Sequence, residues 1–254
     1  MVARRVVITG GATGIGRAIA QGFASLGDKV CICDKSSKFF ESLRQEIPSS
    51  FVLEADVSDE AQVTNFFSQV SNRFGGIDIL ISNAGTSGPA GKFEDLELSD
   101  WQECLSVNLN GAFLTGRFAA KLMRNQGSGL IIFISSTSGL FGVPYRSPYV
   151  VAKWGLIGLT KTLAMELGPV GVRVNAICPG SVNGERMEKV LKMESASSGR
   201  STEAIATEYR QSVSLKKFVT AEDVANMALF LASDSASKIT GQALAVDGHT
   251  ERMA

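Results

Sequence analysis

The sequence lacks an excess of charge of either sign, because 25 Lys and Arg residues balance 25 Asp and Glu residues. Proteins that bind nucleic acid or anionic membranes usually carry a clear basic excess, so neither partner is expected here. The longest strongly apolar runs, such as 130–134, are far shorter than the roughly 20 residues that span a bilayer. The N-terminus leads directly into a strand-like segment without a signal-peptide pattern. We therefore expect a cytoplasmic protein that acts on a small molecule.

Sulfur and imidazole ligands are also scarce, with four cysteines and one histidine. Cys31 and Cys33 could be a metal or redox pair, but at strand spacing they simply share one buried face. We favour that second interpretation and expect reduced thiols and no metal site. His249, close to the C-terminus, is expected to serve packing or a subunit contact.

No linker-like stretch, repeat or long low-complexity tract divides the 254 residues. A chain of this length is near the upper size for one hydrophobic core, so residues 1–254 are expected to form a single domain. Strand-like segments alternate with helical patterns, which predicts an α/β fold: a Rossmann-type doubly wound sheet of about seven parallel strands with helices on both faces. The predicted strands cover residues 5–9, 29–33, 51–54, 77–82, 130–134, 172–177 and 243–246.

A glycine-rich turn, Gly10 to Gly16, follows the first predicted strand and precedes a predicted helix over 17–26. In that context, exposed backbone N–H groups and a helix N-terminus can bind a phosphate. The spacing is Gly-x-x-x-Gly-x-Gly rather than Gly-x-Gly-x-x-Gly, so a merely tight turn is the alternative. Asp34 ends the second strand, 18 residues after Gly16, where a carboxylate can accept hydrogen bonds from an adenine ribose. The alternative for Asp34 is a plain helix N-cap.

The segment from Ser147 to Lys153 is expected to begin a helix that runs through Leu167. Proline is favoured in the first helical turn, and Ser147 could cap the helix. On such a helix Tyr149 and Lys153 lie four residues apart on one face. A phenol titrates near 10, and a fixed cation beside it favours the phenolate. Such a tyrosine can give a proton to a carbonyl or take one from an alcohol, although a chance pair on an exposed helix is the alternative.

A long helix is predicted to begin near Ser99 and to end near Asn125, although its middle has poor helix propensity. It carries Asn108-Leu109-Asn110-Gly111 in its middle, where two asparagines and a glycine disfavour helix. Local misfits of this kind often mark functional positions. The polar, weakly periodic stretch 181–215 is expected to form two short helices on a mobile excursion.

Taken in order, these segments resemble the short-chain dehydrogenase/reductase family over essentially the whole chain. The matching motifs are Thr9-Gly10-x-x-x-Gly14-Ile15-Gly16, Asp56-Val57, Asn83-Ala84-Gly85, the tetrad Asn108, Ser136, Tyr149 and Lys153, then Pro179-Gly180 and Val246-Asp247-Gly248. The chain departs from the family pattern at Ser82, Gly184 and His249. Gly184 stands where the family often has a threonine that holds the nicotinamide amide, which leaves the geometry of the 181–215 loop open.

The resemblance implies an NAD(H)-dependent oxidoreductase that interconverts a secondary alcohol and a ketone. Tyr149 would be the general acid/base, Lys153 would lower the Tyr149 pKa and bind ribose, Ser136 would hold the substrate oxygen, and Asn108 would hold a relay water. Cofactor contacts are implied at Gly10, Thr13, Gly14, Ile15, Gly16, Asp34, Asp56, Val57, Asn83, Ala84, Gly85, Tyr149, Lys153, Pro179, Gly180 and Val182. A homotetramer or dimer is implied as well.

Two arginines point to the substrate class. Arg146 lies three residues before Tyr149, and Arg186 lies just past Pro179-Gly180. A guanidinium presents a fork suited to a carboxylate, so we favour a small hydroxy or keto acid, with Ser138 as a further contact and a polyol-type substrate also compatible. The alternative is that both are solvated surface arginines. An NADPH-dependent 3-oxoacyl-thioester reductase and a non-catalytic cofactor-binding relative are the other functions that the sequence leaves open.

Overall fold

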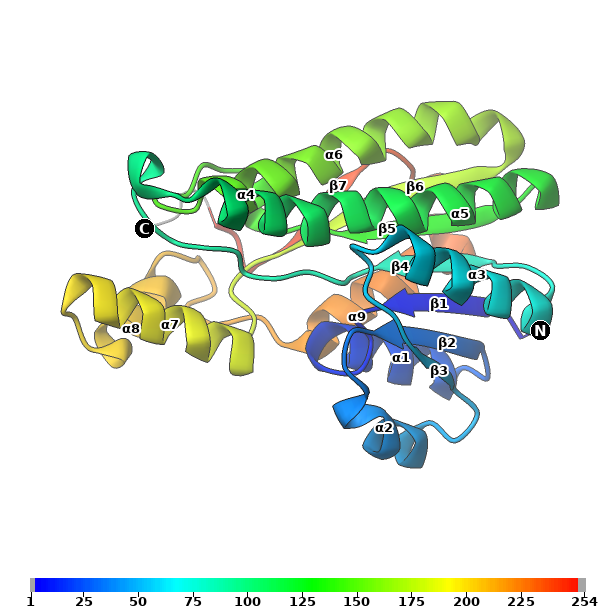
Figure 1. Cartoon of the computed structure of the whole chain (residues 1–254), viewed down its shortest axis with the longest axis horizontal. Helices are drawn as coiled ribbons and strands as arrows, with labels where there is room; N and C mark the ends of the chain where they lie inside the picture. The colour runs from blue at the N-terminus through cyan, green and yellow to red at the C-terminus, as the bar shows by residue number, and fades with distance from the viewer. Residues whose placement is uncertain (1–2, 251–254) are drawn as a thin grey trace.

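The computed structural model describes residues 3–250 and contains a seven-stranded parallel sheet in the order β3-β2-β1-β4-β5-β6-β7 (Figure 1). The strands are β1 (Arg5–Thr9), β2 (Lys29–Asp34), β3 (Phe51–Glu54), β4 (Ile79–Ser82), β5 (Gly129–Ile134), β6 (Val172–Pro179) and β7 (Ala243–Val246). Val6 of β1 pairs with Val30 of β2 on one side and with Ile79 of β4 on the other. The predicted doubly wound parallel sheet is confirmed.

Helices cover both faces of the sheet, because successive side chains of a strand point to opposite faces. Val6 and Ile8 pack into one core layer, whereas Val7 between them packs into the other. The first layer is closed by α1 (Gly14–Ser25), α2 (Phe40–Glu46) and α9 (Ala221–Leu231), and the second by α3 (Glu60–Phe74), α5 (Gly111–Gln126) and α6 (Ser147–Leu167) (Figure 1). Strands buried on both faces explain why their sequences are almost continuously apolar.

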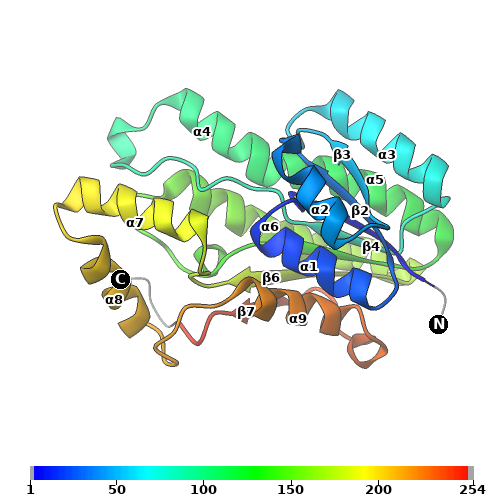
Figure 2. The ribbon, with the colours of Figure 1, turned by 90° about the horizontal axis from the view of Figure 1, so that it is seen from below.

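The strand order reverses between β1 and β4, which places a crevice beyond the carboxyl ends of these two strands. The loops after β1, β2, β4, β5 and β6 all emerge at this edge. Helices α7 (Glu185–Ser198) and α8 (Thr202–Gln211) project beyond the same edge (Figure 2). They agree with the two short helices expected within residues 181–215.

A single helical run extends over residues 98–126, in place of the long helix predicted from about 99 to 125. It consists of α4 (Leu98–Leu105), a π-helical turn (Ser106–Asn110) and α5. Such turns are rare and occur mostly as bulges inside α-helices, frequently at functional sites. The residues with poor helix propensity, Asn108, Asn110 and Gly111, lie in this turn or directly after it.

Helix α6 ends at the predicted Leu167, but it already begins at Ser147, so the predicted serine cap is wrong. Arg146 is the N-cap residue, Ser147 is already helical, and the buried Ser147 hydroxyl has no hydrogen-bond partner among residues 3–250. Pro148 lies in the first turn, where its missing N–H leaves no intrahelical bond unmade.

Other bounds differ from the predicted ones. Helix α1 begins at Gly14 rather than at residue 17, so the end of the glycine turn belongs to the helix. Helix α2 was not anticipated, although its buried Phe40 and Leu43 and the buried Ile47 recur at helical spacing. Among residues 3–250, no helix has the length and apolar character needed to cross a membrane.

Candidate active site

The glycine turn after β1 is held against the end of β4 by Asn83. Its side-chain amide donates to the carbonyl oxygens of Thr9 and Gly10, at 3.0 Å and 2.8 Å. The Thr9 hydroxyl accepts in return from the backbone N–H groups of Asn83 and Ala84, both at 3.0 Å. A Cβ on Gly16 would lie 2.3 Å from the Gly10 carbonyl oxygen, so this close approach requires glycine. The predicted motifs at 9–16 and 83–85 therefore form one unit.

Helix α1 presents its N-terminus without a side-chain cap. The N-cap residue Thr13 makes no capping hydrogen bond, and no acidic residue lies in the first turn. Gly14 has a φ of +53°, and a Cβ there would meet no atom within 4 Å, so the space in front of the helix is open. Unpaired N–H groups at a helix N-terminus bind phosphate well. This turn thus fits the pyrophosphate of a dinucleotide, with Ile15 anchored in the core behind it.

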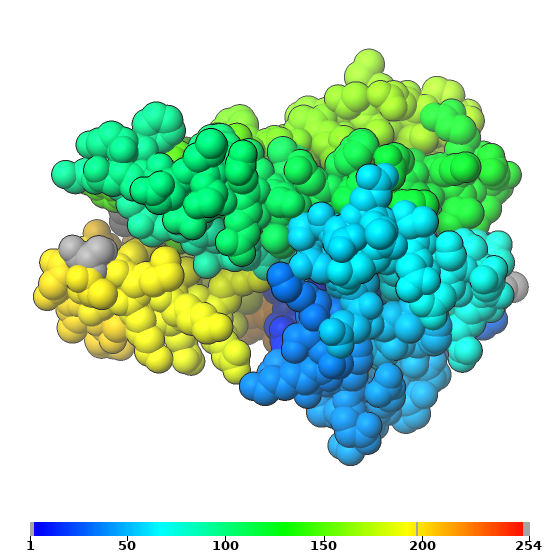
Figure 3. All heavy atoms as spheres, in the orientation of Figure 1, coloured from blue at the N-terminus to red at the C-terminus, as the bar shows by residue number. Residues whose placement is uncertain are grey.

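A cavity of about 280 Å³ lies next to this turn, beyond the ends of β2 and β3. Figure 3 shows the surface hollowed on this face, where atoms of α7 approach the loops after β1 and β2. Residues that line the cavity are Gly10, Asp34, Lys35, Ala55, Asp56, Val57, Ala84, Gly85, Thr86, Glu103 and Val107. Asp34 accepts from the backbone N–H of Ala12 at 3.1 Å, and Ser36 rather than Asp34 caps the next helical turn. The structure thus brings six of the predicted cofactor residues to one hollow.

Lys35 and Asp56 form an ion pair at the rim of this cavity, with Nζ and Oδ2 2.8 Å apart. Asp56 also accepts from the Ser58 backbone N–H at 2.9 Å and from its hydroxyl at 2.6 Å. Burial alone would raise the pKa of Asp56, but the bonds from Lys35 and Ser58 hold it below its usual value. Asp56 is therefore a fixed, ionised carboxylate.

Lys153 is a buried ammonium beside the Tyr149 ring. Its side chain donates to the carbonyl oxygen of Ile134 at 3.0 Å and lies 5.5 Å from the Tyr149 ring centroid. Burial lowers the pKa of Lys153, the phenol of Tyr149 opposes that shift, and the charge of Arg186 adds to it. Tyr149 itself is half-buried, so its ring lies between the buried Lys153 side chain and the solvent.

Asn108 lies in the π-helical turn and is fixed by both ends of its amide. Its oxygen accepts from the Thr86 backbone N–H at 3.2 Å, and its NH₂ donates to the Cys104 carbonyl at 2.9 Å. A Cβ built on Gly85 would lie 2.7 Å from the Asn108 oxygen and 3.7 Å from the Lys153 nitrogen. The side chains of Asn108 and Lys153, two members of the predicted tetrad, therefore both lie next to Gly85.

Ser136 follows β5 and accepts from the backbone N–H of Ser138 at 3.1 Å, which caps the short helical turn 137–139. The neighbouring Ser135 hydroxyl donates to the carbonyl oxygen of Lys153 at 2.9 Å, which ties this loop to α6. Ser138 is buried, with 7% of its surface exposed. The predicted substrate contacts Ser136 and Ser138 thus lie on a rigid loop fixed to the helix that carries Tyr149.

Arg146 and Arg186 reach the same loop after β4 from different elements. Arg146 donates to the Ser87 carbonyl at 2.7 Å, and its guanidinium lies 5.2 Å from the Tyr149 ring centroid. Its Nε is buried without a hydrogen-bond partner within the described residues. Arg186, from α7, donates to the Gly85 carbonyl at 2.6 Å. The two predicted substrate arginines therefore both border the site that contains Tyr149 and Lys153.

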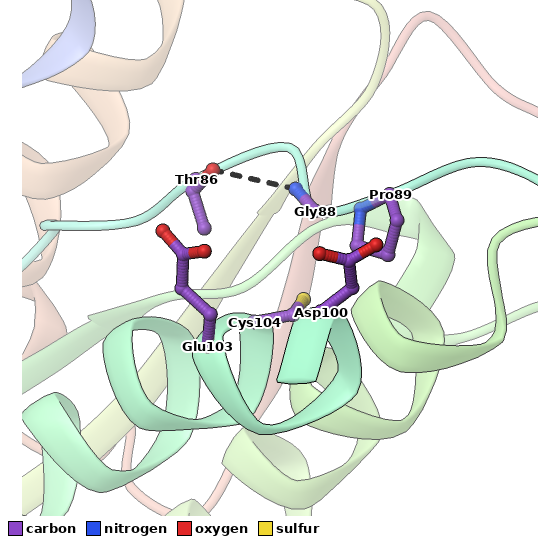
Figure 4. A pocket seen from close by; sticks show the side chains of 6 residues that line it. All are labelled: Thr86, Gly88, Pro89, Asp100, Glu103 and Cys104. Atoms are coloured by element: carbon purple, nitrogen blue, oxygen red, sulfur yellow. Dashed lines mark hydrogen bonds between the residues drawn. The ribbon is translucent and has the colours of Figure 1, made fainter. Parts of the chain in front are cut away.

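A second, smaller cavity of about 170 Å³ lies between the loop at 86–89 and α4 (Figure 4). The carboxylates of Asp100 and Glu103 and the Cys104 side chain face this loop from α4. Glu103 also lines the larger cavity. Sequence reasoning did not single out Cys104 or Glu103, although each lies about one helical turn before Asn108 on the same helical run, and that spacing was a usable signal.

The loop after β6 explains the departure at Gly184. Gly184 is the N-cap of α7 and has a φ of +136°, a conformation that side chains with a Cβ rarely adopt. Gly180 donates to the Val246 carbonyl at 3.0 Å, and Val182 forms a parallel bridge with Val219. The loop after the buried Pro179 is therefore set by these backbone contacts, and a threonine would strain it at residue 184.

His249 contacts the segment that follows α8, where its ring nitrogen Nδ1 is 2.7 Å from the Ser214 hydroxyl. The four cysteines are buried and free, and Cys31 and Cys33 share the core layer predicted for them. Within residues 3–250, no group of three or more His, Cys, Asp or Glu side chains could hold a metal ion.

Comparison with known proteins adds to this geometry. A family model described as enoyl-(acyl carrier protein) reductase matches residues 10–249. The chain is 38% identical to a D-beta-hydroxybutyrate dehydrogenase from Rhizobium meliloti (strain 1021), with 96% of this chain and 97% of the relative covered. It is 37% identical to a 3-oxoacyl-acyl-carrier-protein reductase from Aquifex aeolicus (strain VF5), with 95% of each covered. A crystal structure of NAD+-bound xylitol dehydrogenase superposes with a TM-score of 0.92 at 27% identity, covering 97% of this chain and 98% of that one.

Proposed function

The chain belongs to the short-chain dehydrogenase/reductase family of NAD(P)-dependent oxidoreductases, and from this premise we propose that it interconverts a small hydroxy acid and its keto acid with NAD. The observation that carries the proposal is the buried Lys153 ammonium beside the Tyr149 ring, with two arginines at the same site. The bound nicotinamide cofactor would supply or accept the hydride. The remaining steps belong to the side chains of this chain.

Tyr149 is proposed as the general acid/base, which takes the hydroxyl proton during oxidation and returns it during reduction. The Lys153 ammonium lies 5.5 Å from the Tyr149 ring centroid, so its charge would stabilise negative charge on the phenol oxygen during the proton transfer. Ser136 would hydrogen-bond the substrate oxygen and stabilise its developing charge. Asn108 would hold a water next to Lys153 as the proton exit, which the convergence of both side chains at Gly85 supports.

The substrate carboxylate is assigned to Arg146 and Arg186. Neither arginine has an ion-pair partner among the salt bridges of residues 3–250, and both donate hydrogen bonds to neutral carbonyl oxygens. A carboxylate binds a guanidinium more strongly than a neutral carbonyl does, so an acidic substrate could displace these contacts. Because Arg186 lies in the first turn of helix α7, its bond to the substrate would couple binding to closure of residues 181–215. The hydroxybutyrate dehydrogenase relative acts on a molecule of this class.

NAD is proposed over NADP because Asp34 would accept from the ribose hydroxyls and repel a 2′-phosphate. Like charges about 4 Å apart cost roughly 4 kcal/mol at an effective dielectric of 20. The two nearby cations are already paired: Lys35 with Asp56, and Arg17 with Glu46. Arg17 also donates to the Ser42 hydroxyl at 3.2 Å. Replacement of Asp34 by Ala should therefore narrow the preference for NAD.

We also propose that residues 1–254 act as one dinucleotide-binding and catalytic domain, in which residues 181–215 cover the substrate. Phe113, Val151 and Trp154 expose 44–49% of their surfaces on α5 and α6, which supports a homotetramer or dimer through these helices. Four free, buried thiols are compatible with the cytoplasm. Light scattering of the purified chain would measure the oligomeric state.

The main alternative is an NADPH-dependent 3-oxoacyl-thioester reductase, and the Aquifex aeolicus relative favours it. A screen of hydroxy acids, polyols, sugar acids and a 3-oxoacyl thioester, each with NAD(H) and NADP(H), separates the two. Cofactor absorbance is the readout. We expect the highest kcat/KM for a hydroxy or keto acid with NAD(H). A highest value for an uncharged substrate, or for the thioester with NADPH, would refute the respective part of the proposal.

A further inference from the structure

The larger cavity holds an imbalance of charge. Its lining includes three carboxylates, Asp34, Asp56 and Glu103, and Lys35 is the one cation among the described residues that form it. Lys35 follows Asp34 directly in the chain, so its ammonium is a cation within reach of a phosphate placed at the ribose. A 2′-phosphate is usually accommodated by such a nearby cation.

Lys35 does not face that position freely. Its ammonium contacts Asp56 at 2.8 Å, and its side chain is 74% exposed, whereas that of Asp56 is only 18% exposed. Asp56 is fixed by two hydrogen bonds from Ser58. The pair thus joins an exposed ammonium to a largely buried carboxylate that Ser58 holds in place. Glu103 adds negative potential at Lys35 without forming an ion pair with it.

We propose that Asp56 is a specificity-determining residue, because it holds Lys35 away from a 2′-phosphate and thereby reinforces discrimination against NADP by Asp34. The inference rests on the proposed cofactor preference, and it assigns part of that preference to a residue at the end of a different strand. In the Asp56→Asn variant, Lys35 would lose this ion pair and would place a free ammonium next to Asp34.

The test is cofactor binding to the purified, full-length enzyme, measured by isothermal titration calorimetry with NAD+ and NADP+ and without substrate. The quantity to compare is the ratio of the two Kd values, because it cancels any contact of Asp56 with the adenine ring that both cofactors share. In Asp56→Asn, the discrimination against NADP+ should fall about fivefold, which corresponds to roughly 1 kcal/mol, the upper end of the range for an exposed ion pair.

Glu103→Gln is the matched control. It removes one negative charge from the same cavity but breaks no ion pair of Lys35, so it should change the ratio by less than about twofold. A change in Glu103→Gln equal to that in Asp56→Asn would mean that bulk charge, and not the release of Lys35, controls binding. That result would overturn the proposal.

Lys35→Met supplies the second arm. The side chain is exposed, so the variant should fold, which its melting temperature will show. Alone, it should leave the ratio of Kd values nearly unchanged, and in the Asp56→Asn background it should abolish the gain. If Lys35→Met alone weakens NADP+ binding fivefold, Lys35 already serves the phosphate and the proposal is wrong. A wild-type enzyme that prefers NADP+ would refute the cofactor assignment instead, whatever the variants do.

Discussion

The side-chain ammonium of Lys153 donates a 3.0 Å hydrogen bond to the carbonyl oxygen of Ile134, the last residue of β5. A charge that is almost completely buried needs such a partner, since an unpaired buried cation is costly. The bond fixes the lysine at the carboxyl edge of the sheet. From there its ammonium lies 5.5 Å from the Tyr149 ring centroid, next to the open side of the site.

Replacement of Tyr149 by Phe should abolish most turnover while the fold survives, because the ring packing stays and only the ionisable oxygen is lost. General acid–base catalysis contributes about 100- to 10,000-fold. Steady-state kcat and the melting temperature check this. A folded variant that retains more than about a tenth of wild-type turnover would exclude Tyr149 as the acid/base.

Replacement of Asn108 by Ala should lower both stability and turnover. The buried amide accepts one hydrogen bond from Thr86 and donates two to Cys104, and the groups left unpaired should cost about 1–3 kcal/mol of unfolding free energy. Denaturant unfolding and the pH profile of kcat are the measurements. Asn110→Ala, at an exposed position of the same turn, is the control and should lower neither. Loss of stability with an unchanged kcat would leave Asn108 with a structural role only.

Replacement of Arg186 or Arg146 by Ala should raise KM for an acidic substrate about tenfold or more, with a much smaller change for a neutral analogue of similar size. Arg200→Ala is the matched control, because Arg200 lies between α7 and α8 and pairs with Glu208. Equal effects on charged and neutral substrates would show that these arginines only support the loop after β4.

Replacement of Asp78 by Asn should destabilise the protein by about 1–3 kcal/mol at neutral pH. Burial alone would raise the pKa of Asp78, but its bonds with Arg5, at 2.6 Å and 2.7 Å, lower it below the usual value. A lowered pKa stabilises the fold above the unfolded-state value near 3.9, and that contribution is lost as the pH falls towards the folded-state pKa. Urea unfolding at several pH values should therefore show the variant and wild type converging below about pH 4. A difference that stays constant there would contradict the linkage.

The sheet could be predicted because each strand is a short apolar run ended by a polar or glycine residue, a pattern that buried parallel strands require. The spacing of Tyr149 and Lys153 was likewise sufficient to place both on one helical face. The sequence could not show that Ser147 would leave the cap to Arg146, because loop residues before the helix decide the entry angle. It also could not show which carbonyl would hold Lys153, since Ile134 is 19 residues away and only the packing of α6 on the sheet brings the two residues close.

The pairing of Lys35 with Asp56 depended on tertiary structure in the same way. The two residues follow neighbouring strands, and their contact requires the β2–β3 register in which Asp34 lies beside Glu54. Helix α2, by contrast, had a local signal, because the apolar residues Phe40, Leu43 and Ile47 recur at helical spacing. The helix is short, so this pattern was not recognised. Local pattern therefore specified the elements, whereas the ion pairs and the orientation of polar side chains followed from how the strands align.

The π-helical turn at Ser106–Asn110 acts as a phase shift between two stretches of regular helix. Its wider hydrogen-bonded ring holds one residue more than an α-turn, and one residue corresponds to a rotation of about 100° around the helix axis. If any single residue were deleted from this turn, residues 98–126 would form one uninterrupted α-helix and would keep their backbone hydrogen bonds. Either Cys104 and its neighbours or the core face of α5 would then point the wrong way. Chain length in this segment is therefore constrained in addition to the identity of Asn108.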